Sequence, residues 1–548
     1  IPGSNEAANI SSINLNRGIL PKQPVPDLKD TVQRYLRLYL ETERKIKEFE
    51  KGVGAELQRK LLKRSEYLMG EWLVEAAYMS KSSVVIGFSP GTVSPSQKFS
   101  CPEEMFRFAG KLIAAVCEYD SMIKSGKIKQ QMAGKDPLDM YQHTIMLGTH
   151  RRPNIPYDYL LHTDTSEHII VVHNNEFFKL NVFDDSGKER IPLSANKLAA
   201  SLEELAGRSA VTGIPIGILT GNDRDSWAKD HQKLEACGDN KKIIKDIETA
   251  LFTLSLDKVL SSILKLTCDG CVLTLIISLC LKQYIVSYDG FVGMTYEHSP
   301  CEEVFKVRFE IGQVLLDRFI KEVFSLIHRL SRNIDMECFA FENFGTNEIK
   351  KNKMSPDSFI QMALQLAYWK VHKREPCQIE GAALRRFRNA RLELIRSTCA
   401  ESIEFAHLML KDVSKERKKE AMLKATTGQG IARHLFCLKT VAAKEGLSSL
   451  ELFTDSGYTK SAHFNVASSQ VPYESASFMC YGPWAPDGYS CCYNPRPHDI
   501  RVACSSFNAC EETCTKKFAQ ALKESFCEMM EIKCNKGATL YPEVFSKQ

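Results

Sequence analysis

Strand-like and helix-like hydrophobic patterns alternate along almost the whole chain of 548 residues. Short apolar runs bounded by turn residues indicate strands, and apolar positions repeated every three or four residues indicate helices. Alternation of the two predicts the α/β class. A chain of this length exceeds what one hydrophobic core organises, so we expect two or three domains, two of them α/β.

The local patterns give several predicted elements. The longest apolar run, at 271–281, is about half the length that crosses a bilayer, so we expect a buried strand or short helix there and no transmembrane segment. The other predicted elements are a helical region from Asp27 to about Met79, a strand in 82–91, two strands in 167–189 joined at Asn174-Asn175, a strand at 214–219 leading into a helix, a strand at 499–507, and a final helix from about Glu512 to Ile532.

Charge and cysteine content narrow the class of protein. The 72 basic and 67 acidic residues are interspersed and leave a net charge of +5, so we expect no nucleic-acid partner. The 19 cysteines are scattered and odd in number, which favours reduced thiols in an intracellular, reducing compartment over a disulfide framework. Mitochondrial, peroxisomal and cytoplasmic locations all fit this composition.

Common metal and catalytic motifs are absent. The sequence has no H-E-x-x-H, no P-loop, no G-x-G-x-x-G after a strand and no G-x-S-x-G. A single C-x-x-C at 268–271 lacks a second half. His168 and His173 lie five positions apart in one predicted strand, so their side chains point to opposite faces. We therefore expect no metal site.

Three lysines precede a strong helix start. Ser355-Pro356-Asp357 combines a capping hydroxyl, a proline at the first helical position and an acid in the first turn. Lys350, Lys351 and Lys353 lie just upstream, and cations beside the free N–H groups of a helix start form a phosphate-binding corner. The alternative is a solvated basic loop before an ordinary helix.

Three other stretches carry groups that could do chemistry. "FNVASSQVP" (464–472) places two serines at a predicted strand end, where a hydroxyl can donate to an oxyanion or simply end a strand. In "MCYGPWAPDGYSCCYNP" (479–495), Tyr481 and Trp484 can face a cation or pack in a core loop. His298 in "YEHSPCE" is either a working base or a core histidine, and this stretch alone leaves both open.

Nine stretches in one order carry a family resemblance: "LPKQPVPDL", "EHIIVVHNNEFF", "GILTGNDRDSWAK", "YEHSPCE", "SPDSFIQMALQLAYW", "ALRRFRNARLELIRS", "ARHLFCLK", "SSQVP" and "YGPWAPDGYSCCYNP". With them the chain resembles the choline/carnitine acyltransferase family from about Leu20 to Ile532. The resemblance implies two similar chloramphenicol-acetyltransferase-like α/β domains, with mixed sheets flanked by helices and an active-site tunnel between them.

The local patterns and the resemblance together divide the chain. We predict an extended N-terminal arm at 1–28, a helical segment at 29–82 that packs with the C-terminal domain, an N-terminal α/β domain at 83–312 that carries His298, and a C-terminal α/β domain at 313–548 that carries the coenzyme A and carnitine sites.

The resemblance also implies residue roles. His298, in an H-x-x-x-E pattern with Glu302, matches the family's general base, and a neutral imidazole can take a hydroxyl proton at neutral pH. The alkoxide then attacks the thioester directly, without an acyl-enzyme, while Ser469 holds the oxyanion. Coenzyme A or acetyl-CoA is thus a substrate, and no permanently bound cofactor is expected. The implied coenzyme A positions are Lys350, Lys351, Lys353, Ser355, Asp357 and Gln470.

Carnitine carries a carboxylate that choline lacks, so a carnitine enzyme needs a cation in its site. Arg433 stands where carnitine enzymes have arginine and choline enzymes asparagine. Tyr481 matches the aromatic residue beside the trimethylammonium, and Met479 matches the residue that closes the acyl pocket in acetyl-specific members. The resemblance therefore favours acetyl transfer between coenzyme A and carnitine, by an enzyme that we expect to be monomeric.

The sequence departs from the family pattern in the proposed alcohol and phosphate sites. Leu392 is nearer the valine of choline enzymes than the threonine of carnitine enzymes, and Ile379 and Gly381 replace a tyrosine and a serine common to both. Thr346 replaces a phosphate lysine, and Trp484 replaces a smaller residue.

Two family segments also lack counterparts, one before "YIVSYDGFVGMTYEH" and one of about thirty residues after Glu303. The alternatives are therefore a choline acetyltransferase, or a catalytically silent member that binds acyl-CoA or carnitine.

Overall fold

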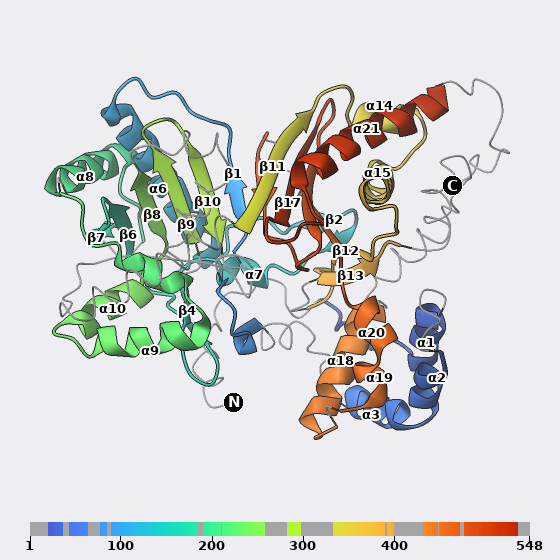
Figure 1. The fold of residues 1–548 in the computed structure, drawn as a ribbon. Helices are drawn as coiled ribbons and strands as arrows, with labels where there is room; N and C mark the ends of the chain where they lie inside the picture. The colour runs from blue at the N-terminus through green and yellow to red at the C-terminus, as the bar shows by residue number, and fades with distance from the viewer. Residues whose placement is uncertain are drawn as a thin grey trace.

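Two β-sheets lie beside each other with helices packed on them (Figure 1). The structure, a computed structural model, describes residues 20–36, 43–63, 77–84, 89–184, 190–209, 211–257, 282–296, 333–388, 392–398, 431–447, 449–471 and 476–534. Every helix in these ranges is too short or too polar to cross a membrane. Nowhere in them do three histidine, cysteine, aspartate or glutamate side chains gather in a group that could hold a metal ion.

The first sheet is seven-stranded and mixed. Strand β8 runs parallel to both of its neighbours, β6 and β9, and all other neighbouring pairs in this sheet are antiparallel. Its order is β15 (Phe478–Cys480), β1 (Gly91–Val93), β10 (Val292–Tyr296), β9 (Lys282–Ser287), β8 (Thr253–Asp257), β6 (His168–His173) and β7 (Glu176–Asn181).

The second sheet is six-stranded and repeats this arrangement. Strands β12, β14 and β16 form the parallel group, with antiparallel strands on both sides. Both sheets therefore have the same sequence of strand directions, except that the first has β15 as an additional edge strand. The order is β11 (Ile334–Phe341), β17 (Ile500–Phe507), β16 (Tyr489–Pro495), β14 (Val466–Gln470), β12 (Gln378–Ala383) and β13 (Leu392–Arg396). The predicted α/β class with two sheet-containing domains flanked by helices is confirmed.

Helices cover the first sheet on both faces, as the uninterrupted apolar strand "HIIVVH" requires. On one face, Ile169 and Val171 of β6 pack with α6 (Pro102–Lys124) and α8 (Ala195–Arg208). On the other, Ile170 and Val172 pack with the short 3₁₀ helix η3 (Ile216–Gly221), α9 (Arg224–Glu235) and α10 (Asn240–Glu248). Successive residues of this strand thus belong to two separate cores.

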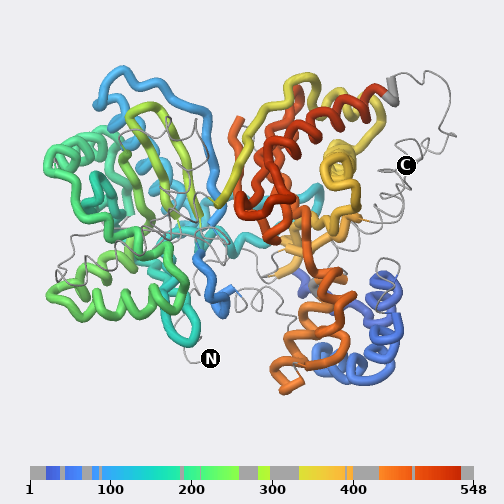
Figure 2. The backbone as a smooth tube through the Cα atoms, viewed as in Figure 1, coloured from blue at the N-terminus to red at the C-terminus, as the bar shows by residue number. Residues whose placement is uncertain are grey.

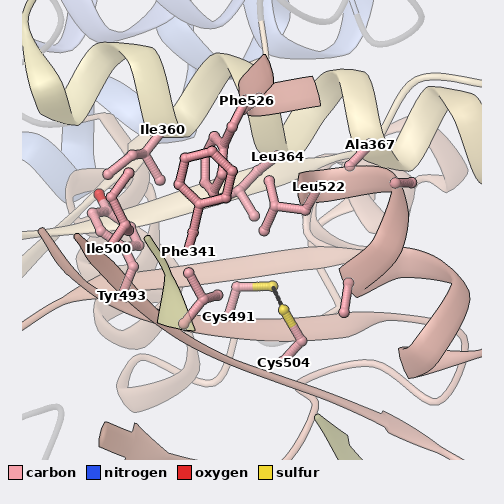
Figure 3. Packing of buried hydrophobic residues seen from close by; sticks show 14 of the residues in the cluster. Phe341, Ile360, Leu364, Ala367, Cys491, Tyr493, Ile500, Cys504, Leu522 and Phe526 are labelled. Carbon is pink, nitrogen blue, oxygen red and sulfur yellow. Dashed lines mark hydrogen bonds between the residues drawn. The ribbon is translucent and has the colours of Figure 1, made fainter. Parts of the chain in front are cut away.

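One face of the second sheet packs against α15 (Pro356–His372) and α21 (Thr515–Cys534). Phe341, Leu364, Leu522 and Phe526 interdigitate in this core, and the sulfurs of Cys491 and Cys504 lie 3.4 Å apart beneath them (Figure 3). The residues named here come from two helices and three strands, so this cluster fixes both helices on the sheet.

A third group of helices joins residues from distant parts of the chain. Helices α1 (Leu28–Leu36), α2 (Glu43–Lys51) and α3 (Val53–Leu62) share a core with α18 (Ile431–Lys444) and α19 (Glu451–Thr454), and α20 (Ser456–Ser461) follows. Figure 2 shows the blue N-terminal helices beside these orange ones. The remaining elements are β2 (Met132–Ala133), β3 (Asp136–Pro137), α7 (Tyr141–Thr144), β4 (Thr149–Arg152), β5 (Tyr159–His162) and α14 (Thr346–Lys351).

Most local predictions that fall on described residues are confirmed. Strands β6 and β7 form a hairpin in which Asn174 and Asn175 have φ values of 51° and 60°, the conformation that a two-residue primed turn needs. Helix α15 begins at Pro356 with Ser355 as its cap. The final helix begins at Thr515, three residues after the predicted start. The apolar run at 271–281 lies outside the described residues.

The predicted strand at 214–219 is wrong. Residues Ile216–Gly221 form the 3₁₀ helix η3, and all six are buried. A segment that is apolar on every side has no periodicity to distinguish a strand from a buried helical turn. Pro215, which has no N–H to donate to a strand neighbour, immediately precedes it.

Candidate active site

The strands of the six-stranded sheet place their residues alternately on two faces. Ser468 points towards α15, because its Oγ lies 3.1 Å from Oε1 of Gln361. The next residue, Ser469, therefore points to the opposite face. Residues paired directly across neighbouring strands share a face, so the pairing also tells which residues of β12 and β13 lie on the face of Ser469. The face opposite α15 includes Ile379, Gly381, Leu392, Ala467 and Ser469, and we call it the α18 face.

The name reflects the helix that packs there. Ala432, in the first turn of α18, contacts the cluster formed by Ile379, Leu394, Ala467 and Leu392. Four predicted site residues from three strands are thus brought onto one face, under the start of a helix that carries a fifth, Arg433. The side chain of Arg433 lies outside the described part of the structure.

The departures from the family pattern make this face more apolar. Ile379 is 2% exposed and packs on Leu394 and Ala467. Gly381 is exposed, and a Cβ added there would have no heavy atom within 4 Å. The space that a serine would occupy is therefore open. Ser469, which is half-buried, carries the hydroxyl on this face that the resemblance assigns to the oxyanion.

The segment 479–481 connects the two sheets beside this face. Met479 lies in β15, paired with Thr92 of β1 and buried, and its Sδ lies 3.9 Å from the hydroxyl of Tyr296. Tyr296 is the last described residue before 297–332. His298 and Glu302 lie outside the described residues, so their assigned roles stay predictions.

Tyr481 is held between strands of the six-stranded sheet. Its hydroxyl lies 3.1 Å from the carbonyl oxygen of Ala467 and 3.2 Å from that of Cys491, so it donates to the backbone of β14 and β16. Its own carbonyl oxygen accepts a bond from Ser505 Oγ at 2.7 Å. Burial raises the pKa of Tyr481 well above 10, which keeps the phenol neutral. Trp484 is 53% exposed and meets Phe464 edge-on.

The three predicted phosphate lysines gather at the start of α15. Lys350 and Lys351 occupy the last turn of α14, and Lys353 lies in the short connection with a positive φ of 57°. All three are exposed. Ser355 Oγ accepts the backbone N–H of Ser358 at 3.4 Å, which leaves other first-turn N–H groups directed towards the same end. The geometry combines cations with a positive helix end, as an anion site requires.

Asp357 and Gln470 meet at a residue that the sequence did not indicate as functional. The Tyr493 hydroxyl donates to Asp357 and accepts from Gln361 Nε2 at 2.7 Å, and Gln470 is its direct neighbour in the β14–β16 register. Burial, and then the Asp357 carboxylate, raise the pKa of Tyr493 well above 10, so the hydroxyl stays a donor. Gln361 also contacts Ser468, the residue before Ser469. This network runs from α15 to the strand of the predicted oxyanion hydroxyl.

A sequence model of the Choline/Carnitine o-acyltransferase family matches residues 23–310 and 302–524, most of the chain. The chain belongs to the choline/carnitine acyltransferase family. It is therefore an acyltransferase, as the resemblance predicted.

Relatives in this family are similar over nearly their whole length. Carnitine O-acetyltransferase of Columba livia is 33% identical, with 94% of this chain and 93% of that protein covered. The Homo sapiens carnitine O-acetyltransferase is 30% identical, with 95% and 94% covered. Choline O-acetyltransferase of Sus scrofa is also 30% identical, with 93% and 92% covered. Overall identity separates the two kinds of relative by only a few per cent, so the alcohol must be argued from individual residues.

The alignment lengths bear on the missing segments. The comparison with the Columba livia relative runs over 596 positions, although this acyltransferase has 548 residues. That relative therefore contains segments that have no counterpart here. The sequence predicts such losses in two places. Both adjoin or fall within the ranges 258–281 and 297–332, which lie outside the described residues.

Proposed function

We propose that this acyltransferase moves a short acyl group reversibly between coenzyme A and carnitine. The supporting observation is the α18 face, where Ser469, Ile379, Gly381 and Leu392 lie together under the first turn of the helix that carries Arg433. In this proposal the carnitine occupies a tunnel between the two domains at that face. The similarity to carnitine O-acetyltransferases over nearly their full length supports the same reaction.

In the proposed mechanism His298 acts as a general base. Its neutral imidazole takes the proton from the carnitine hydroxyl, and the resulting alkoxide attacks the thioester carbonyl of acetyl-CoA. The Ser469 hydroxyl donates to the oxyanion of the tetrahedral intermediate. Collapse of that intermediate releases the coenzyme A thiolate, which recovers the proton from the imidazolium. No acyl-enzyme is formed, and Glu302 orients the base.

The choice of carnitine depends on Arg433. A guanidinium can pair with the carnitine carboxylate through two parallel hydrogen bonds, and choline offers no group to neutralise it. Tyr481 supplies an aromatic surface for the trimethylammonium. Met479, buried in β15, keeps the acyl pocket short and so favours acetyl.

The coenzyme A site follows from the arrangement at α15. Lys350, Lys351 and Lys353 are exposed beside the start of this helix, where they can bind phosphate groups. Asp357, fixed by the Tyr493 hydroxyl, and Gln470 line the same end of the sheet. Gln470 ends β14 on the face opposite to the α18 face, and Asp357 is joined to its neighbour Tyr493. In this proposal the two substrates therefore approach Ser469 from different faces of the sheet.

The test is a thiol-release assay with acetyl-CoA and either carnitine or choline. We expect the wild-type protein to prefer carnitine. Arg433→Asn should lower kcat/KM for carnitine about 10- to 150-fold, the cost of about 1.5–3 kcal/mol for a hydrogen bond to a charged group. Arg59→Asn, on the exposed surface of α3, is the matched control and should change neither rate. Equal or better turnover of choline by the wild type refutes the carnitine assignment.

A second candidate is a silent member of the family that binds acyl-CoA or carnitine without reaction. It is motivated by the segments that relatives have and this chain lacks, and by the loss of polar side chains at Ile379 and Gly381. Calorimetric binding of coenzyme A together with no thiol release from either alcohol would establish it. Thiol release above the blank would exclude it.

A further inference from the structure

One edge strand of each sheet carries a cysteine, and these two cysteines lie close together. Strand β15 is the edge of the seven-stranded sheet and β11 is the edge of the six-stranded sheet. Cys480 ends β15 and pairs with Gly91, whereas Cys338 lies in β11 and pairs with Ala503. Their Sγ atoms lie 3.7 Å apart. Figure 1 shows β1 and β11 beside each other at the centre of the molecule.

The backbone on the Cys480 side of this pair is held firmly in place. Cys480 belongs to the β15–β1 ladder, and the next residue, Tyr481, is bonded to Ser505 and to the carbonyl oxygens of two strands. Ser505 lies on β17, the direct neighbour of β11. The two thiols are therefore presented to each other by two fixed strands. A disulfide has an S–S length of about 2.05 Å, so the two sulfurs must approach by about 1.7 Å to bond.

Access to one member distinguishes this pair from the other close cysteines, because Cys338 is exposed although Cys480 is buried. Cys491 and Cys504 have sulfurs only 3.4 Å apart, but both are fully buried in the core under α15 and α21 (Figure 3). The hydrogen bond with Cys491, and then burial, raise the pKa of Cys504 well above its usual range, so no thiolate forms there. Cys338, in contrast, is exposed, and a soluble oxidant can reach it.

We propose that Cys338 and Cys480 form a peroxide-sensitive site that links the two sheets reversibly. The thiolate of Cys338 attacks hydrogen peroxide, which gives a sulfenic acid and releases one water after protonation. The Cys480 thiol then attacks the sulfenic sulfur, so that the S–S bond forms and a second water leaves. Two thiols and one peroxide thus give one disulfide and two waters. A dithiol reductant reverses the bond.

The consequence for catalysis rests on the proposed function. Cys480 is adjacent to Met479, the residue assigned to the acyl pocket, and the new bond would tie that strand to the opposite sheet. In the oxidised protein the substrates would bind and leave between two domains that the disulfide holds together. We expect the oxidised form to transfer acetyl at least tenfold more slowly than the reduced form.

The first experiment detects the bond itself and needs no acyl transfer. The reduced full-length protein is treated with hydrogen peroxide, remaining thiols are blocked with N-ethylmaleimide, and peptides are mapped without reduction. We expect one cross-linked pair that contains residues 338 and 480, which disappears after treatment with dithiothreitol. Cys338→Ser should abolish it. Cys491→Ser, the control at the buried pair, should leave it unchanged.

Two results would overturn the site. One is alkylation of both Cys338 and Cys480 at a peroxide dose that oxidises Cys101, an exposed cysteine and an internal measure of access. The other is a disulfide from Cys338 to some other cysteine.

The catalytic consequence has its own readout. Thiol release should fall on oxidation of the wild type, recover on reduction, and stay constant in Cys338→Ser under both treatments. Unchanged turnover of a fully linked protein would refute the effect on catalysis. If the reduced protein releases no thiol at all, the proposed function fails, while peptide mapping still decides the oxidation site.

Discussion

The two sheets share a strand order but differ in how their faces are covered. In the first sheet, adjacent residues of β6 enter two separate helix-covered cores. In the second, one face packs on α15 and α21, while the α18 face retains an exposed Gly381 and a half-buried Ser469. The same arrangement of strands thus serves as a closed scaffold in one half and as a scaffold with an accessible face in the other. The candidate site lies on the face that is incompletely covered.

The largest expected effect tests the proposed base, which the sequence assigns to the half of the molecule with the closed scaffold. His298→Ala should reduce kcat for acetyl transfer to carnitine by about 10²–10⁴-fold, the usual contribution of a general base. Steady-state thiol release measures it, and circular dichroism checks that the variant folds. A variant as active as the wild type would show that the proposed base plays no part.

A second test addresses the closed scaffold. Ile169→Ala and Ile170→Ala change neighbours in β6 that face different cores, and both side chains are fully buried. Each should therefore lower the free energy of unfolding by about 2–5 kcal/mol. Urea unfolding followed by fluorescence measures both. If one of the two variants is as stable as the wild type, one face of this sheet is not a packed core.

The adjacent serines of β14 make the matching test in the second sheet. Ser469→Ala should lower kcat about 10²-fold, because it removes the hydroxyl proposed to bind the oxyanion. Ser468→Ala, one residue earlier, removes a buried bond to Gln361 and should lower stability by about 1–3 kcal/mol with little change in kcat. Equal losses of kcat in both variants would contradict the assignment of the two faces.

The smallest effect concerns the helical group that carries α18. His434 is buried, with Nδ1 2.7 Å from Thr31 Oγ1 and Nε2 2.8 Å from Gln58 Oε1, and the charges of Arg34 and Asp27 act on it in opposite directions. Burial, reinforced by Arg34, lowers the pKa of His434 from 6.5 to about 4. Between these values the unfolded chain binds a proton that the folded protein does not, so stability falls as pH is lowered through that range. The loss is about 2 kcal/mol from pH 7 to pH 5.

Unfolding curves at several pH values measure this dependence. His434→Gln, which has no titrating ring, should reduce the slope between pH 7 and pH 5. His498→Gln, at an exposed position, is the control and should leave the slope as in the wild type. A wild-type stability that is constant over this range would contradict the proposed role of the buried ring.

Local elements were well predicted because their signals are local. The cap at Ser355, the Asn174-Asn175 turn and the strand that ends at Gln470 each depend on neighbouring residues. The Tyr493 network and the pairing of β15 with β1 join segments far apart in the chain, and nothing in either segment indicates its partner. The grouping of Ser469, Ile379 and Leu392 was predicted only through the family resemblance, and the strand register then placed them on one face.

Strand β15 also has a consequence for synthesis of the protein on the ribosome. Residues 91–296 supply six strands of the first sheet, but the partner for the outer side of β1 is made only when residues 478–480 emerge. Until then the N-terminal half presents an unsatisfied strand edge, a surface prone to association with other chains. A truncation before Phe478 would make that condition permanent, so the N-terminal half depends on the C-terminal half for its completion.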